Sequence, residues 1–388
     1  MRWHTNLRLP EPAATEQRSW RLGIDAADRI AVLEPLLPGS TASGENWHGA
    51  WLSPLGIDLQ INGGLGLPFP ELQPEQLPRL LELLDLLWRD GVEAICPTLV
   101  TCGVAPLRQA LAVLEQARQQ HRSGRCQLLG AHLEGPFLAP ERRGAHPLQH
   151  LCPPSLAALE QRIAGFENQI ALVTLAPELE GAAALIHRLQ QLGIAVSLGH
   201  SAADEAQARI AYDQGVTLLT HVFNAMAGMH HRAPGPVAAA CLRNDVALGL
   251  IADGVHVAPS MLLLLLQLAP GRVFLVSDAL APYGLADGEY RWDERVLMVH
   301  KGACRLADGT LAGVTLPLLE GVRRLAEWGC PAGQAIAAAT LTPRQALGDQ
   351  RSAAEMLLGM PITETLLWQQ DNSGLNWRRY GAAQLKGL

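Results

Sequence analysis

The sequence predicts an α/β fold, a TIM (β/α)8 barrel, from three features: eight apolar runs, their alternation with helical patterns, and polar side chains that close several of the runs. Such alternation is typical of repeated βα units around a parallel sheet, and eight units close a barrel of about 250 residues. A chain of 388 residues therefore has room for a barrel and a smaller unit. The eight runs are Leu55–Gln60, Ala94–Pro97, Gln127–Glu134, Ile170–Ala176, Ala195–His200, Thr217–His221, Ala247–Ala252 and Val273–Asp278.

Helical patterns lie between these runs, for example at Glu75–Arg89 and at Ser260–Leu268. Another helix is expected after Ser201, which offers an N-cap, with Asp204 and Glu205 as an acidic first turn. The main alternative fold is a doubly wound sheet. That fold requires neither eight strands nor functional side chains after the third, fifth, sixth and eighth of them, so we favour the barrel.

The two ends of the chain differ in composition and pattern from this central region. Residues 1–53 carry dispersed Gly, Pro, Ser and Trp, and the C-terminal segment LLWQQDNSGLNWRRYG is typical of short strands and turns, whereas Ser352–Met360 looks helical. We therefore expect the segments 1–53 and 349–388 to form one small β-sandwich-like domain, and residues 54–348 to form the barrel.

Composition excludes several classes of protein. The net charge of −7, from 30 basic and 37 acidic residues, argues against general electrostatic binding to nucleic acid or to an anionic membrane. The seven cysteines are scattered without a C-x-x-C pair, so neither a disulfide framework nor a thiolate zinc site is indicated. The start of the chain has no signal-peptide-like stretch, and the strongest apolar run, Met261–Leu266, is too short to span a bilayer. We expect a soluble cytoplasmic protein.

Three potential metal ligands each close an apolar run: Glu134, His200 and His221. Taken singly, the glutamate is equally well explained as a buried carboxylate paired with arginine, and a lone histidine after a strand is more often a core or rim residue. The pattern repeats, however, 21 residues apart (221 − 200), which puts two imidazoles on adjacent strands. Because the carboxyl ends of barrel strands converge on one face, the three together predict a mononuclear metal site with room for water.

Further polar residues are candidates for the remaining chemistry. Asp278 closes the eighth run, where a carboxylate beside a cation can remove a proton from water and return it to a leaving group. A fourth metal ligand and a cap of the next turn remain alternative roles for it. His146 and Arg232 lie in expected loops, where a solvent-exposed charge is the usual alternative for the arginine, and His256 is a second anion-binding candidate after the seventh run.

Ten segments in a fixed order give the chain a family resemblance over about residues 50–348. They are LGIDLQINGG (55–64), CPTLVT (96–101), GAHLEGPFL (130–138), GAH (144–146), GHS (199–201), THVFNAM (220–226), HRAPG (231–235), IADGVHV (251–257), SDA (277–279) and DGTLAG (308–313). Together they resemble the N-acetylglucosamine-6-phosphate deacetylase family of the amidohydrolase superfamily. The resemblance implies metal-dependent hydrolysis of N-acetyl-D-glucosamine 6-phosphate to D-glucosamine 6-phosphate and acetate, and a homodimer.

The resemblance also implies roles for individual positions. Glu134, His200 and His221 match the ligands of one divalent ion, with Zn²⁺ expected. Asp278 matches the catalytic acid and base, and His146 matches a histidine that polarises the acetyl carbonyl and stabilises the oxyanion. Sugar-phosphate contacts are implied for Ala145, Asn224, Ala225, Arg232, Asp253, His256, Leu311, Ala312 and Gly313.

Within that set we expect Arg232 and His256 to bind the phosphate, since an arginine fork suits phosphate oxygens. The region of Arg232 is also expected to lie near a partner's site. One departure concerns the metal count, because Gln60 and Asn62 stand where many amidohydrolases have H-x-H. An amide is a poor substitute for imidazole as a ligand, so one ion is predicted, and Gln60 is expected to orient substrate or water.

Two other functions stay open at this point. The first is a related amidohydrolase activity, either on another N-acetyl sugar phosphate or on a different amide. The second is a non-catalytic sensor of sugar phosphate that retains the barrel.

Overall fold

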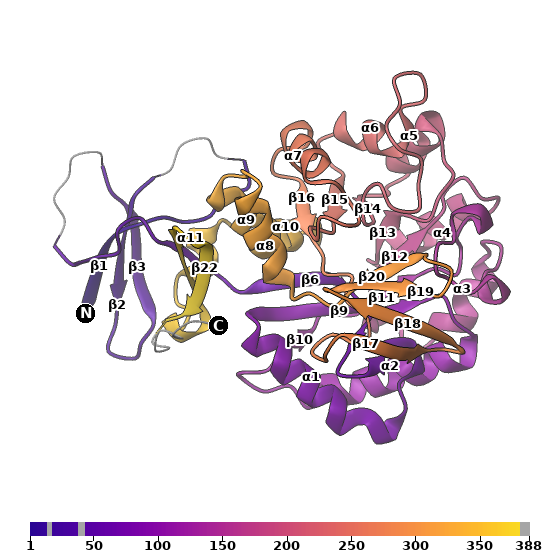
Figure 1. Ribbon diagram of the computed structural model, residues 1–388, viewed down its shortest axis with the longest axis horizontal. Helices are drawn as coiled ribbons and strands as arrows, with labels where there is room; N and C mark the ends of the chain where they lie inside the picture. Colours follow the sequence, from indigo (N-terminus) through magenta and orange to yellow (C-terminus); the bar gives the residue numbers. More distant parts are fainter. Residues whose placement is uncertain (14–17, 38–42, 381–388) are drawn as a thin grey trace.

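A parallel sheet curled into a barrel forms the centre of the larger lobe in the computed structural model, which describes residues 1–13, 18–37 and 43–380 (Figure 1). The strands follow one another in the order β10-β9-β11-β12-β13-β14-β15-β16, and β6 pairs with β9. They are β6 (Gly56–Ile61), β9 (Val92–Val100), β10 (Gln127–Leu128), β11 (Ala131–Glu134), β12 (Ile170–Leu175), β13 (Ala195–Leu198), β14 (Leu218–Leu219), β15 (Ala247–Leu250) and β16 (Val273–Leu275). Each predicted run overlaps one of these strands, and the third contains both β10 and β11.

The barrel closes just beyond the end of β16. There the backbone N–H of Asp278 donates to the carbonyl of Gln60 at 2.8 Å, and that of Asn62 donates to the carbonyl of Ala279 at 2.7 Å. These bonds join the first and last strands of the barrel. The predicted fold class is confirmed, and the strands are nearly continuous apolar runs because helices cover their outer faces.

Helices alternate with the strands along the chain. They are α1 (Leu77–Arg89), α2 (Val104–Gln119), α3 (Leu156–Ile163), α4 (Ala182–Gln191), α5 (Glu205–Asp213), α6 (Gly235–Cys241), α7 (Pro259–Leu268), α8 (Leu318–Glu327), α9 (Ala332–Thr340), α10 (Thr342–Ala346) and α11 (Ala353–Leu357). The predicted helices at Glu75–Arg89 and Ser260–Leu268 correspond to α1, which a 3-10 turn at Pro74–Gln76 precedes, and to α7.

The predicted N-cap of α5 is wrong. Asp204, not Ser201, caps the helix, because its carboxylate accepts from the backbone N–H of Gln207 at 2.8 Å and the Gln207 side chain accepts in return from the N–H of Asp204. This is a capping box. The hydroxyl of Ser201 instead donates to Glu178 at 2.7 Å. Glu205 does lie in the acidic first turn, as expected.

Two small sheets from the two ends of the chain form the smaller lobe, the first mixed and the second antiparallel (Figure 1). One contains β1 (Arg2–Leu7), β2 (Trp20–Ile24), β3 (Ile30–Pro35) and β4 (Glu45–Asn46), and the other joins β5 (Trp51–Ser53) to the hairpin β21 (Leu366–Asp371) and β22 (Gly374–Arg379). The strands expected near the C-terminus and the helical stretch at α11 are therefore present. The exact domain boundaries stay a prediction, because Ala337 and Leu341 pack into the core of this lobe as well.

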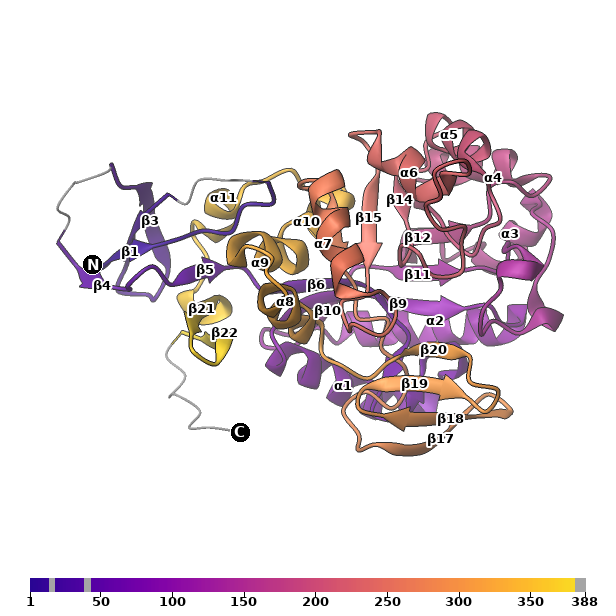
Figure 2. The same cartoon turned by 45° about the horizontal axis from the view of Figure 1, so that its top comes forward.

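An antiparallel insert follows the barrel strands, and the sequence analysis did not anticipate it. It consists of β17 (Gly288–Trp292), β18 (Arg295–His300), β19 (Ala303–Leu306) and β20 (Leu311–Val314), which lie below the barrel in Figure 2. A smaller two-stranded sheet pairs β7 (Gly63–Gly64) with β8 (Leu67–Pro68). The insert has its own apolar cluster around Leu280, Trp292 and Leu297.

All seven cysteines are free, and Cys96, Cys126, Cys304 and Cys330 are buried. Within the described ranges, no helix has the length and hydropathy needed to cross a membrane.

Candidate active site

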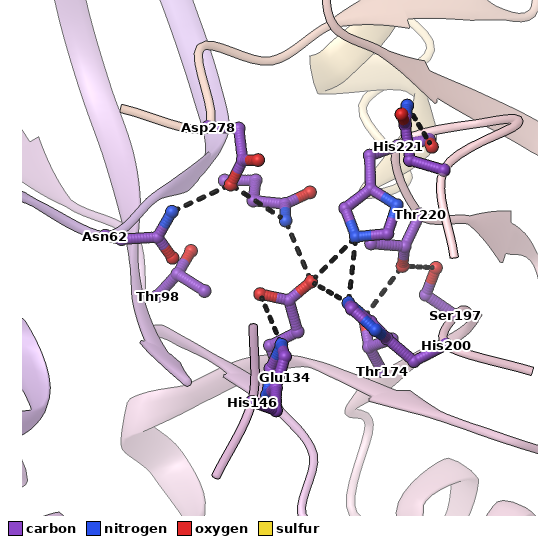
Figure 3. Close-up of polar contacts among 12 residues, drawn as sticks. Asn62, Thr98, Glu134, His146, Thr174, Ser197, His200, Thr220, His221 and Asp278 are labelled. Atoms are coloured by element: carbon purple, nitrogen blue, oxygen red, sulfur yellow. Dashed lines mark hydrogen bonds and ion pairs between the residues drawn. The ribbon is translucent and has the colours of Figure 1, made fainter. Parts of the chain in front are cut away.

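Three side chains converge at the carboxyl end of the barrel strands (Figure 3). Glu134 is the last residue of β11, whereas His200 and His221 each lie two residues beyond the ends of β13 and β14. The Nε2 atoms of His200 and His221 are 3.2 and 3.1 Å from Oε1 of Glu134 and 3.0 Å from each other. All three residues are at most 5% exposed. The three predicted metal ligands therefore form one compact group.

The protonation of this group fits a cation. Nδ1 of His200 lies 2.9 Å from the carbonyl oxygen of Arg142, which can only accept, so Nδ1 carries the proton and Nε2 turns a lone pair toward Glu134. Burial favours the neutral form of Glu134, but its close contacts with His200 and His221 hold its pKa well below the usual value. A carboxylate and two imidazoles whose ligand atoms all lie within 4.8 Å of one another are the donor set of a mononuclear zinc-type site.

The backbone at these positions is unusual. His200, His221 and Asp278 have φ angles of 47°, 26° and 51°, in the left-handed region that residues other than glycine rarely occupy. Gly199 leads into one of these turns, where a Cβ would lie only 2.6 Å from Cγ2 of Thr174. Strained backbone that the surrounding structure holds in place is frequent at functional sites.

A buried chain of hydroxyl groups lies beneath the ligands (Figure 3). Nε2 of His132 lies 2.7 Å from the hydroxyl of Thr174, which is 2.8 Å from that of Thr220, which in turn is 2.5 Å from the hydroxyl of Ser197. Burial lowers the pKa of His132 to about 4, so its ring is neutral. This layer satisfies polar groups inside the barrel and supports the strand ends that carry the ligands.

Asp278, just beyond the end of β16, lines the same cavity as the three potential metal ligands. Its Oδ1 accepts from Nδ2 of Asn62 at 2.7 Å and from Nε2 of Gln60 at 3.3 Å, and Gln60 also donates to Oε1 of Glu134 at 3.0 Å. Burial, together with the nearby charge of Glu134, raises the pKa of Asp278 well above its usual value. A bound cation acts in the opposite direction and favours the ionised carboxylate.

His146 lies on the other side of Glu134, with Nε2 3.8 Å from Oε2. Its Nδ1 is 3.4 Å from the backbone nitrogen of Thr101, which donates to it, and 2.9 Å from the Thr101 hydroxyl. Because a backbone N–H can only donate, Nδ1 is the acceptor and Nε2 carries the proton. Burial, with the neighbouring His200, lowers the pKa of His146 to about 3. The ring is thus a neutral hydrogen-bond donor that faces the cavity.

These groups line a cavity of about 290 Å³. Six of the predicted substrate contacts line it together with His146 and Asp278: Ala145, Asn224, Ala225, His256, Leu311 and Ala312. They come from loops after several strands and from the insert. The structure therefore brings most of the predicted site residues to one place.

Four other predicted residues lie outside the lining. Gln60 is behind the carboxylates that it bridges, and Asp253 accepts from Nδ1 of His256 at 2.7 Å, so it orients that histidine. Gly313 packs against the Asp278 backbone, where a Cβ would lie 2.8 Å from the carbonyl oxygen. Arg232 is exposed on the loop between His221 and α6, and its side chain makes no contact with the cavity.

Several lining residues escaped the sequence analysis. Trp292 comes from the insert. The available sequence signal for its hairpins was the pair of turn residues Asp293 and Gly302, which separate β17 from β18 and β18 from β19. Arg142 is the one lysine or arginine among the described lining residues. Arg295 does not line the cavity but donates to the carbonyl of Ala145 at 2.8 Å, so the insert holds the loop that carries His146.

Comparisons with known proteins agree with this geometry. No family model matches the chain. The N-acetylgalactosamine-6-phosphate deacetylase of Escherichia coli O157:H7 is 38% identical over 320 residues, which cover 82% of this chain and 83% of that protein. The N-acetylglucosamine-6-phosphate deacetylase of Vibrio furnissii is 35% identical over 304 residues, which cover 78% and 75%. This chain belongs to the N-acetylglucosamine-6-phosphate deacetylase family.

The solved structures support the same assignment. The N-acetyl-D-glucosamine-6-phosphate deacetylase from Mycobacterium smegmatis superposes with a TM-score of 0.80 at 30% identity, over 98% of this chain and 99% of that one. The predicted family resemblance is confirmed. Membership in the N-acetylglucosamine-6-phosphate deacetylase family also implies an amide hydrolase that uses a divalent metal, for which Glu134, His200 and His221 are suitable ligands.

Proposed function

We propose that this protein hydrolyses the acetamido group of N-acetyl-D-glucosamine 6-phosphate and releases D-glucosamine 6-phosphate and acetate. The observation that carries the proposal is the convergence of a three-ligand metal site, a carboxylate and a neutral imidazole donor in one cavity. Family membership supports the same reaction class.

We propose Zn²⁺ as the ion held by Glu134, His200 and His221, since two imidazoles and one carboxylate are a usual catalytic zinc set. When bound there, the ion lowers the pKa of water and polarises the acetyl carbonyl. Gln60 donates to Glu134 at 3.0 Å and so orients one ligand from behind.

Asp278 carries the proton in this mechanism. Its ionised carboxylate removes a proton from the attacking water as oxygen bonds to the acetyl carbon, and a tetrahedral intermediate forms. The protonated carboxyl then gives that proton to the nitrogen while the carbon–nitrogen bond breaks, which releases the amine and acetate. The raised pKa of Asp278 suits a group that must hold the proton between the two steps.

His146 stabilises the oxyanion. Because Nδ1 accepts from Thr101, the proton on Nε2 points into the cavity. A neutral donor in a buried site can stabilise negative charge on the carbonyl oxygen without first losing its proton.

For the phosphate we propose His256, which Asp253 orients, together with Arg232. Because Arg232 is exposed and outside the cavity lining of its own chain, it would act on the cavity of a partner subunit in a homodimer. Seven unpaired cysteines support a reducing, cytoplasmic location.

The test is acetate release from N-acetylglucosamine 6-phosphate by metal-depleted protein, with and without added Zn²⁺. We expect acetate only when the metal is restored. Asp278→Asn should keep the fold and the bound metal but lose about 10²- to 10⁴-fold in kcat, the usual contribution of general acid–base catalysis. A folded, metal-loaded parent that releases no acetate contradicts the proposal and favours the sensor function.

A second substrate has specific support. The relative that is 38% identical acts, by its name, on the galactosamine epimer. The same acetate assay with N-acetylgalactosamine 6-phosphate compares the two epimers directly. A higher kcat/KM for that epimer would reassign the substrate and leave the mechanism unchanged.

A further inference from the structure

The two oxygens of the Asp278 carboxylate lie in different environments. Oδ1 accepts two side-chain amide hydrogen bonds, from Asn62 at 2.7 Å and from Gln60 at 3.3 Å. Within the described part of the chain no hydrogen bond reaches Oδ2, and Asp278 lines the cavity. One oxygen is therefore held and the other is free to exchange a proton.

Both amides come from β6 and its extension, a strand that supplies no metal ligand. Residues two apart on a strand face the same side, so the side chains of Gln60 and Asn62 both reach Asp278. Figure 3 shows the Asn62 amide directed at the Asp278 carboxylate. The backbone is pinned at the same place, because the N–H of Asp278 donates to the carbonyl of Gln60 at 2.8 Å. A side chain that is fixed at both its backbone and one oxygen has little rotational freedom.

The direction of the Asn62 amide follows from the chemistry of its partner. An ionised carboxylate only accepts hydrogen bonds, so the atom 2.7 Å from Oδ1 must be the amide nitrogen. Asn62 makes no other side-chain hydrogen bond among the described residues, and it is 5% exposed. Gln60, in contrast, also contacts Glu134, so its removal would disturb the metal site as well.

We propose that Asn62 is a positioning residue for Asp278: it binds Oδ1 and leaves Oδ2 as the oxygen that exchanges the proton. This role rests on the proposed function. Oδ2 forms a bond to the proton as the water O–H bond breaks, and it transfers that proton to the nitrogen as the carbon–nitrogen bond breaks. Throughout both steps Oδ1 remains hydrogen-bonded to the amide, so the carboxylate does not have to rotate between them.

The first test substitutes Asn62→Leu, which has a similar volume but no donor. Misplacement of a reacting group by about 1 Å costs about 10²-fold, so we expect kcat to fall about 10- to 100-fold while KM and zinc content stay within about 3-fold of the parent. Asn62→Ala keeps the comparison possible if the leucine variant does not fold. An unchanged kcat, or a loss confined to KM, overturns the positioning role.

A double-mutant cycle separates positioning from general damage. In an Asp278→Asn background, Asn62→Leu should cause little further loss, because the group that it positions is already inactive. Asn376→Leu is the matched control, since its amide contacts only Ser373 and Gly374 within the β21–β22 hairpin of the smaller lobe, and its effect should be the same in both backgrounds. The full loss from Asn62→Leu in the Asp278→Asn background overturns the proposal.

Crystal structures of the zinc-loaded parent and Asn62→Leu provide a readout without turnover. We expect Oδ1 of Asp278 to be held by the amides in the parent and the carboxylate to rotate in the variant. An identical orientation in both overturns the positioning role. Absence of acetate release by the parent contradicts the proposed function instead, so the two failures are distinguishable.

Discussion

The floor of the cavity and its rim differ in how the fold holds their side chains. The floor consists of Glu134, His200, His221 and Asp278, which all lie at barrel strand ends, are at most 7% exposed and share hydrogen bonds with buried partners. Displacement of any one of them requires the sheet or its neighbours to move.

The rim has a different construction. His256 lies in the loop after β15, Trp292 on β17 and Leu311 on β20, so three separate segments must come together. Arg232 lies further out and is exposed. Proteins of this architecture commonly keep chemistry on a rigid scaffold and vary recognition in the loops.

The comparison therefore predicts that substitutions in the floor change metal binding and kcat, whereas substitutions in the rim change KM. The following variants test that division, from the largest expected effect to the smallest.

Glu134→Ala should have the largest effect. It removes the charged ligand, which lies 3.2 and 3.1 Å from the Nε2 atoms of His200 and His221, so activity should fall to the level of the metal-depleted parent. Metal analysis after dialysis should find less than one ion per chain, with the parent as control. Full zinc occupancy in this variant would show that the ion is held elsewhere.

His146→Leu should have the next largest effect. Loss of one oxyanion donor costs about 10²- to 10³-fold in kcat, and the bound metal should remain. Burial holds the pKa of His146 at about 3, so the ring is already neutral at about pH 5 and above. The acidic limb of the kcat profile should thus keep its midpoint in the variant. A midpoint that disappears with the imidazole would mean that His146 titrates during turnover.

Arg232→Ala should have the smallest effect of the three. Loss of one charge-assisted contact costs about 1.5–3 kcal/mol, so KM for the phosphorylated sugar should rise about 10- to 100-fold with little change in kcat. Arg351→Ala, in an exposed pair with Asp349 far along the chain, is the matched control. If Arg142→Ala raises KM instead, the phosphate contact belongs to the arginine that lines the cavity of its own chain.

Most of the floor could be predicted from the sequence. A polar residue at the end of a buried apolar run is a local signal, and Glu134, His200, His221 and Asp278 all show it. The eight strands were predictable for the same reason, because burial on both faces leaves few polar positions. The motif resemblance then supplied chemical roles that periodicity alone does not contain.

The rim and the insert were much less predictable. Strands β17 to β20 are short and exposed on one face, so their alternation is weak, and Trp292 carries no motif of its own. The incorrect N-cap prediction at Ser201 has a related cause. Both Ser201 and Asp204 are good capping residues, and it is a tertiary contact that decides between them: the Ser201 hydroxyl binds Glu178, whereas Asp204 caps the helix.

The sequence by itself determined the barrel, the order of its strands and the residues that end them, because apolar periodicity and polar run-ends are local properties of the chain. Tertiary structure alone decided which oxygen of Asp278 is held, since Asn62 lies 216 residues away along the chain. It also decided that Arg232 stays outside its own cavity and that the insert covers the rim. These are consequences of barrel closure and long-range packing, which bring together residues that no local pattern connects.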